Sequence, residues 1–172
     1  MEHVLIDREL RKLATRVLAS CRARGLKIAT AESCTGGLVA AVLTEIAGSS
    51  DVFDRGFVTY SNEAKRELLG VPAATLRRHG AVSGETAEAM AAGALKASQA
   101  DLSVAITGIA GPSGGSKGKP VGLVYFAAAR RGGRRLVRAR HYGKIGRRRV
   151  RLRSVTEALK LLQRLILDRA AR

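Results

Sequence analysis

The sequence predicts a layered α/β protein with a mixed, mostly parallel sheet. Short apolar runs typical of buried strands alternate with segments whose apolar residues have helical spacing, the pattern of an α/β fold. The last two runs are separated only by Arg131-Gly132-Gly133, which suits a hairpin and makes the sheet mixed. A chain of 172 residues without a repeat or linker predicts a single domain over 1–172.

The first part of the chain is expected to form two helices and two strands. Leucine and valine at helical spacing predict a helix over 3–24, which Gly25 ends. The apolar run 26–31 predicts a buried strand, and helical spacing returns over 36–47. Aromatic and β-branched residues then predict a strand over 55–60.

Three helices follow before the next strand. Segments 62–69 and 72–79 have the composition of short helices, and the second has a proline near its first turn. Ser83 is the predicted N-cap of a stronger helix over 83–99, which has an apolar face of alanine, methionine and leucine.

The last part of the chain is expected to complete the sheet and cover it with one helix. The runs 102–107 and 121–129 are rich in strand-forming residues, and 134–142 is the expected hairpin partner of the second run. Residues 147–170 have leucine, valine and isoleucine at helical spacing, which predicts the closing helix. Aromatic residues make up only 3% of the chain, so the core must consist of Ala, Val, Leu and Ile.

The positive charge of the chain is concentrated near its C-terminal end. The net charge is +17, of which residues 130–172 contribute +14. Such a surface attracts phosphate groups without sequence preference. No aromatic residues are interleaved for base stacking, and no nucleic-acid-binding signature is present. We therefore expect at most non-specific attraction to nucleic acid.

Other features of the sequence limit its location and its cofactors. Two cysteines provide no disulfide framework, no signal peptide is recognisable, and no apolar run approaches the ~18 residues that span a membrane. We expect a soluble, cytoplasmic protein with no membrane partner. Three separated histidines and the lack of a Cys-x-x-Cys pair provide no metal-ligand spacing, so we expect neither a metal nor a cofactor.

Three segments with polar or glycine residues are expected to leave one edge of the sheet. They are residues 32–37, 60–65 and 107–119, and each follows a predicted strand. If the three strands are parallel, the segments converge on one crevice, where open α/β sheets bind ligands. Neither glycine-rich segment has the spacing of a nucleoside-triphosphate or dinucleotide phosphate loop. Nucleoside-triphosphate chemistry is therefore not expected.

Ser33 is the first candidate nucleophile, because it stands at the start of a predicted helix. The backbone N–H groups of Thr35, Gly36 and Gly37 would then be available to stabilise an oxyanion. The alternative is that Ser33 or Thr35 only caps the helix. Cys34 is a rival nucleophile at the same helix end, but no histidine is near it in the sequence, and small buried cysteines are common.

Lys65 is the candidate base for Ser33. A lysine that is partly desolvated loses its proton near neutral pH, and Tyr60 at the strand end could relay that proton or hold the amine. The alternative is that Lys65 is an ordinary solvated helix lysine.

Several motifs in order resemble those of the CinA C-terminal domain family, the competence- and damage-inducible proteins, whose stand-alone form is a nicotinamide-nucleotide amidohydrolase. The resemblance covers about residues 3–167. The matching stretches are Thr30-Ala-Glu-Ser-Cys-Thr-Gly-Gly37, Tyr60-Ser-Asn-Glu-Ala-Lys65, Val82-Ser-Gly-Glu-Thr-Ala87, Ile106-Thr-Gly-Ile-Ala-Gly-Pro112 and Lys119-Pro-Val-Gly122.

The resemblance implies a three-layer α/β/α sandwich that hydrolyses the carboxamide of nicotinamide mononucleotide to nicotinate mononucleotide and ammonia. It implies that Ser33 attacks the carbonyl, with Lys65 and Tyr60 as the proton-transfer pair. The remaining expected site residues bind the oxyanion or the substrate: Cys34, Thr35, Gly36, Gly37, Thr107, Gly108, Gly111 and Arg147. The family often has Gly-Asp-Arg where this chain has Ile145-Gly146-Arg147. Arg147 therefore provides the positive charge, but the aspartate that usually precedes it is missing.

Two hypotheses of different classes follow. The first is a metal-independent amidase of pyridine nucleotide metabolism, and a homodimer is the default assembly. The second is a non-catalytic nucleotide- or nucleic-acid-binding module that uses the basic C-terminal region.

Overall fold

The structure, a computed structural model, describes residues 6–167, which form a five-stranded sheet in the order β2-β1-β3-β4-β5. β1 (Ile28–Glu32) pairs in parallel with β2 (Phe53–Val58) and β3 (Leu102–Gly108). β4 (Leu123–Arg130) is antiparallel to β3 and to β5 (Arg135–His141). The predicted mixed sheet is confirmed, and β4 alone runs against the other four strands.

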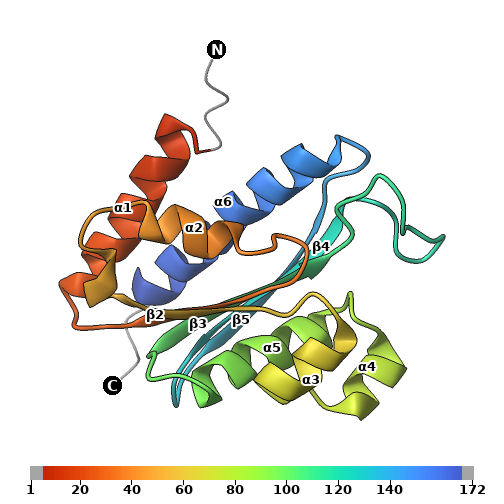
Figure 1. Cartoon of the computed structure of the whole chain (residues 1–172), viewed down its shortest axis with the longest axis horizontal. Coiled ribbons are helices and arrows are strands. Elements are labelled where there is room, and N and C mark those ends of the chain that lie inside the picture. The colour runs from red at the N-terminus through yellow and green to blue at the C-terminus, as the bar shows by residue number, and fades with distance from the viewer. Residues whose placement is uncertain (1–5, 168–172) are drawn as a thin grey trace.

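Helices cover both faces of this sheet, so the implied three-layer arrangement is observed (Figure 1). One face is covered by α1 (Arg8–Arg22), α2 (Leu38–Thr44) and α6 (Arg147–Leu167). The other face is covered by α3 (Asn62–Leu69), α4 (Ala73–His79) and α5 (Gly84–Lys96).

The alternation of side chains along the strands divides the core between these two faces. Bulky residues such as Ile106 and Phe126 point towards α1 and α6, where they form the larger core. Alanines dominate the other face, where Ala105 and Ala127 of the sheet and Ala91 of α5 are fully or almost fully buried. Small side chains on both partners allow α5 to pack closely on the sheet.

The ends of several elements differ from the predicted ones. Residues 3–5 and 168–170, which were included in the first and last helices, lie outside the described residues. α2 begins two residues later than expected because Gly36 and Gly37 have positive φ angles of 59° and 91°, which an α-helix does not accommodate. A short 3₁₀ helix, η1 (Ser49–Asp51), follows α2 and was not predicted.

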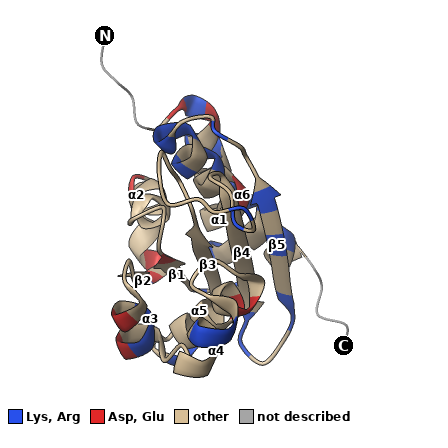
Figure 2. Cartoon of the chain, turned by 90° about the vertical axis from the view of Figure 1, so that its right-hand side faces the viewer, with Lys and Arg blue, Asp and Glu red and all other residues tan. Residues whose placement is uncertain are grey.

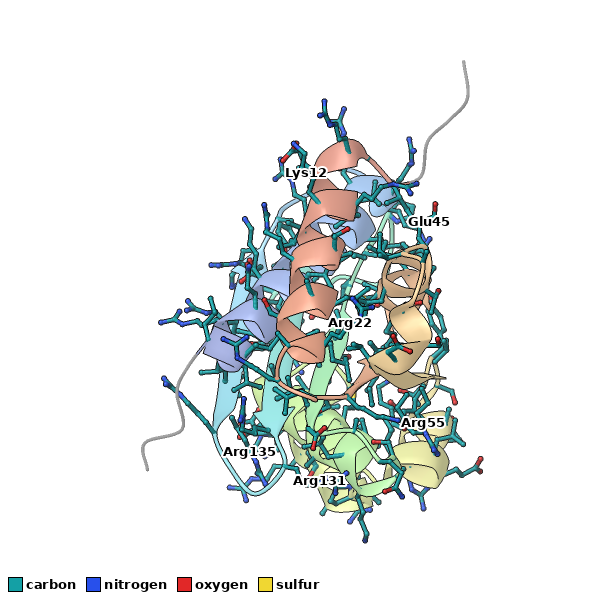
Figure 3. All side chains as sticks on the ribbon, turned by 90° about the vertical axis from the view of Figure 1, so that its left-hand side faces the viewer. Lys12, Arg22, Glu45, Arg55, Arg131 and Arg135 are labelled. Carbon is teal, nitrogen blue, oxygen red and sulfur yellow. The ribbon has the colours of Figure 1, made fainter. Side chains whose placement is uncertain are left out.

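The β4–β5 hairpin is fixed to α5 through one arginine at its turn. The guanidinium of Arg131 donates to the backbone carbonyls of Ser98 and Ala100, just beyond the end of α5. Figure 3 shows Arg131 and Arg135 at this end of the hairpin. Across residues 6–167, no helix combines the length and apolarity needed to cross a bilayer.

Candidate active site

The carboxyl ends of the parallel strands β1, β2 and β3 meet at one edge of the sheet, and a pocket of about 270 Å³ lies there. The predicted convergence of the three segments is therefore confirmed. Eight of the expected site residues line the pocket: Ser33, Cys34, Tyr60, Lys65, Thr107, Gly108, Gly111 and Arg147. Six further lining residues were not proposed as site residues: Ala81, Val82, Ile109, Ala110, Ser113 and Gly114.

Lys65 is buried beside Ser33. Ser61 caps the N-terminus of α3 by accepting a hydrogen bond from the N–H of Ala64, and Lys65 follows in the first turn with its side chain directed inwards. Only 1% of Lys65 is exposed, and its Nζ lies 3.2 Å from Ser33 Oγ and 2.9 Å from the carbonyl oxygen of Thr59. The alternative interpretation, a solvated helix lysine, is wrong.

This burial also favours the neutral amine. Loss of hydration penalises the charged ammonium and lowers the pKa of Lys65 from its ordinary value. A neutral amine has two N–H donors and one lone pair. The carbonyl oxygens of Thr59 and Ser61, at 2.9 and 3.4 Å, can accept the two donors. The lone pair is then left for the hydroxyl proton of Ser33, as general-base catalysis requires.

Glu32, the last residue of β1, occupies the N-terminus of α2. Its carboxylate is 1% exposed and accepts hydrogen bonds from the N–H groups of Gly37 and Val39 through Oε2, at 3.1 and 3.0 Å, and of Ala40 through Oε1, at 2.9 Å. From the sequence, Glu32 is a carboxylate of the site, a helix cap or a salt-bridge partner, and these hydrogen bonds identify it as the cap.

The amides expected to bind the oxyanion are therefore partly committed to other partners. The N–H of Gly36 donates to the carbonyl of Ser33, and the N–H of Gly37 donates to Glu32. Neither glycine lines the pocket, and nor does Thr35, so contact between these three residues and the substrate stays a prediction. In the part of the chain that the structure describes, the N–H groups of Cys34 and Thr35 have no acceptor in this turn.

Cys34 lines the pocket as a buried thiol with little nucleophilic character. Burial is the largest influence on it and raises its pKa to about 12, although Arg147 and Arg151 act in the opposite direction. The thiol is therefore protonated at neutral pH, whereas the nucleophilic form of cysteine is the thiolate.

Tyr60 contacts Arg147 rather than Lys65. Its hydroxyl accepts a hydrogen bond of 2.8 Å from Nη2 of Arg147, and Nη1 of the same guanidinium donates to the carbonyl of Gly111 at 3.0 Å. Among residues 6–167, Tyr60 and Lys65 share no hydrogen bond. The expected proton-transfer pair is thus not joined by a hydrogen bond, and Arg147 instead links the Tyr60 and glycine loops.

Thr107 and Gly108 shape the floor of the pocket. The hydroxyl of Thr107 donates to the carbonyl of Ala81 at 2.6 Å, so it is held by the protein. A Cβ on Gly108 would lie 2.7 Å from Cγ2 of Val124 and 2.8 Å from the carbonyl oxygen of Leu123. Gly108 is therefore required by close backbone packing between β3 and β4.

Arg151 supports the turn that carries Ser33, a contact that the sequence did not reveal. It lies one turn after Arg147 on α6, and its Nη2 donates to the carbonyl of Thr35 at 2.8 Å. The i, i+4 spacing to Arg147 places both arginines on one side of the helix. That spacing was the available signal, but it is obscured by the many arginines of 147–153.

No metal site is evident within residues 6–167, where no three His, Cys, Asp or Glu side chains are grouped to hold an ion. His79 is not among the residues that line the pocket, and its Nδ1 lies 3.3 Å from Oε1 of Glu85.

Comparisons with known proteins identify relatives of this chain and of its fold. Nicotinamide-nucleotide amidohydrolase PncC of Escherichia coli K12 is 58% identical over 125 residues, which cover 73% of this chain and 76% of that protein. A putative competence-damage inducible protein of Caldicellulosiruptor bescii is 47% identical over 165 residues, which cover 95% of this chain but 39% of that longer protein. The solved structure of the competence/damage inducible protein CihA from Agrobacterium tumefaciens has a TM-score of 0.92 at 54% identity and covers 93% of this chain and 97% of its own.

The pattern that defines the CinA C-terminal domain matches residues 10–166, nearly the whole described chain. With this match, and with relatives of this identity over most of its length, the protein belongs to the CinA C-terminal domain family.

Proposed function

We propose that the protein is a nicotinamide-nucleotide amidohydrolase that converts nicotinamide mononucleotide and water to nicotinate mononucleotide and ammonia. The observation that carries the proposal is the buried Lys65, whose Nζ lies 3.2 Å from Ser33 Oγ in the pocket at the sheet edge. The name of the E. coli relative supplies the reaction and the substrate.

In the first step, Ser33 is the nucleophile and Lys65 the base. The neutral Lys65 amine takes the hydroxyl proton as Ser33 Oγ forms a bond to the carboxamide carbon. The carbonyl oxygen becomes an oxyanion. The N–H groups of Cys34 and Thr35 can donate to it, because among the described residues neither has another acceptor in this turn. The C–N bond then breaks, and the Lys65 ammonium returns its proton to the leaving nitrogen, which departs as ammonia.

In the second step water is the nucleophile, Lys65 is again the base, and Ser33 Oγ is the leaving group. Lys65, neutral again, accepts a proton from a water molecule as it attacks the Ser33 ester. The ester C–O bond breaks, and Ser33 Oγ recovers the proton from Lys65. The products are nicotinate mononucleotide and the original enzyme, so the cycle balances without an added reactant.

Arg147 is suited to the nucleotide phosphate. Its guanidinium lies at the pocket rim and is aligned by Tyr60 and the Gly111 carbonyl, and arginine binds phosphate oxygens with two parallel N–H groups. In this arrangement Tyr60 orients Arg147, a role that replaces the proton relay expected from the sequence. The homodimer stays a prediction, which light scattering after size-exclusion chromatography would test.

The test is ammonia release from nicotinamide mononucleotide by the purified protein. Ser33→Ala should abolish release, whereas the matched neighbour Cys34→Ser should keep most of it, because the thiol of Cys34 is protonated and takes no part in the steps above. Activity that survives in Ser33→Ala and disappears in Cys34→Ser would reject Ser33 as the nucleophile. A wild-type protein that binds the nucleotide without any turnover would favour the non-catalytic alternative.

A further inference from the structure

A second charged feature lies on β5 and α6, outside the pocket of Ser33. We call it the basic surface and define it by six side chains: Arg138, Arg140, Arg149, Arg153, Lys160 and Arg164. A hollow between the strand and the helix contains four of them together with Glu157 and Leu161. None of the six lines the Ser33 pocket. Figure 2 shows Lys and Arg recurring along β5 and in the chain that leads to α6.

Four of these cations form a stripe along α6. Arg149, Arg153, Lys160 and Arg164 recur at helical spacing, and all four are exposed. The apolar positions of α6, such as Val155, Leu159 and Leu162, face the core on the opposite side of the helix. At 1.5 Å per residue the stripe from 149 to 164 is about 22 Å long.

Two arginines of β5 extend the stripe sideways. Arg138 and Arg140 pair with Phe126 and Val124, whose side chains point to the α6 face, so they share that face. Arg140 donates to Glu157 at 2.9 Å, and Glu157 is the one acidic residue in the hollow. In the described part of the chain, the other five side chains of the basic surface have neither a hydrogen bond nor an ion pair.

From this arrangement we propose that the basic surface binds the phosphate backbone of duplex DNA without sequence preference. A duplex carries one negative charge per ~1.7 Å of its axis, so a stripe about 22 Å long meets several phosphates of one molecule. Arginine guanidinium groups match phosphate oxygens in charge and geometry. The six side chains include no aromatic ring, and proteins that bind single strands stack the bases on such rings. Contacts to phosphate carry no sequence information, so a duplex bound through its backbone is the occupant that this surface fits.

The experiment is a titration of a fluorescein-labelled 20-base-pair duplex with the full chain, followed by fluorescence anisotropy over a series of NaCl concentrations. The test variant is Lys160→Gln/Arg164→Gln. The matched control is Arg77→Gln/Arg78→Gln, which removes the same charge from exposed positions of α4 on the other side of the sheet. Ammonia release is measured on every sample as a check of folding, because none of the four residues lies in the Ser33 pocket.

The test variant should bind the duplex about tenfold more weakly at low salt. The slope of log Kd against log[NaCl] should fall by about 2, one unit for each phosphate that the variant no longer neutralises. The control variant should retain the wild-type slope and affinity within about twofold. Equal weakening in both variants would show that net charge, and not this surface, attracts DNA. The proposal would also be overturned if the wild-type protein did not bind the duplex at low salt. It would be overturned as well if a polyglutamate of equal charge bound the protein more tightly than the duplex does.

Discussion

The Nζ of Lys65 lies 3.2 Å from the Oγ of Ser33, and the lysine that carries it is 1% exposed. Ser33 directly follows β1 and Lys65 lies in the first turn of α3, 32 positions further along the chain. Burial lowers the pKa of Lys65, so this amine loses its proton at a lower pH than an ordinary lysine while it lies beside a hydroxyl. This pairing makes activity depend on pH.

The first prediction is the direction of that dependence. Lys65 acts as a base only when it is deprotonated, so kcat/KM should rise with pH through the pKa of Lys65, with an inflection below the ordinary lysine value of 10.5. Lys65→Arg keeps the charge but stays protonated, so ammonia release should fall by about 10²- to 10⁴-fold and lose this inflection. An inflection that persists unchanged in Lys65→Arg would assign it to another group.

The second prediction concerns Glu32 and stability. Glu32→Ala leaves the N–H groups of Gly37, Val39 and Ala40 without their acceptor, which should cost about 3 kcal/mol of unfolding free energy in urea titrations. Glu32→Gln should cost less, because its carbonyl oxygen can still accept from two N–H groups while its NH₂ group opposes the third. Both variants should lower kcat, because Glu32 fixes the turn that carries Ser33.

Equal stability of the Ala and Gln variants would contradict this explanation. The capping role would also be wrong if Glu32→Ala unfolded at the same urea concentration as the wild type.

The sequence predicted the order of elements and the edge of the site, because both depend on local patterns and on parallel strands ending together. It did not predict which amides are free, since the turn after β1 depends on a buried carboxylate that hydrogen bonds to three N–H groups of the turn and α2. Nor did it pair Tyr60 with Arg147, because that contact joins residues 87 positions apart. Arg151 could not be distinguished among neighbouring arginines until α6 was placed against Thr35.

The third prediction separates the two roles considered for Tyr60. If Tyr60 orients Arg147, Tyr60→Phe should raise KM for nicotinamide mononucleotide several-fold with little change in kcat. Arg147→Met should raise KM by about 10- to 100-fold, as expected for the loss of a charged hydrogen bond. The double variant should be no worse than Arg147→Met alone, because the two residues act through one contact.

The control for this prediction is the dephosphorylated substrate, nicotinamide riboside. Arg147→Met should leave its turnover nearly unchanged, because the phosphate that the guanidinium binds is missing. A fall in kcat without a change in KM in Tyr60→Phe would instead favour the proton relay that the sequence suggested.

The fourth prediction compares two glycines that are ten positions apart. A Cβ on Gly108 would approach the Leu123 carbonyl oxygen to 2.8 Å, the same oxygen that accepts the N–H of Ile109 at 2.9 Å. Gly108→Ala should therefore push β3 away from β4, destabilise the protein by about 2 kcal/mol, and lower ammonia release by displacing the pocket floor. Gly118→Ala meets nothing within 4 Å and should change the unfolding free energy by less than about 0.5 kcal/mol. Urea titrations of both variants measure the difference, and similar stabilities would show that β3 and β4 can separate without cost.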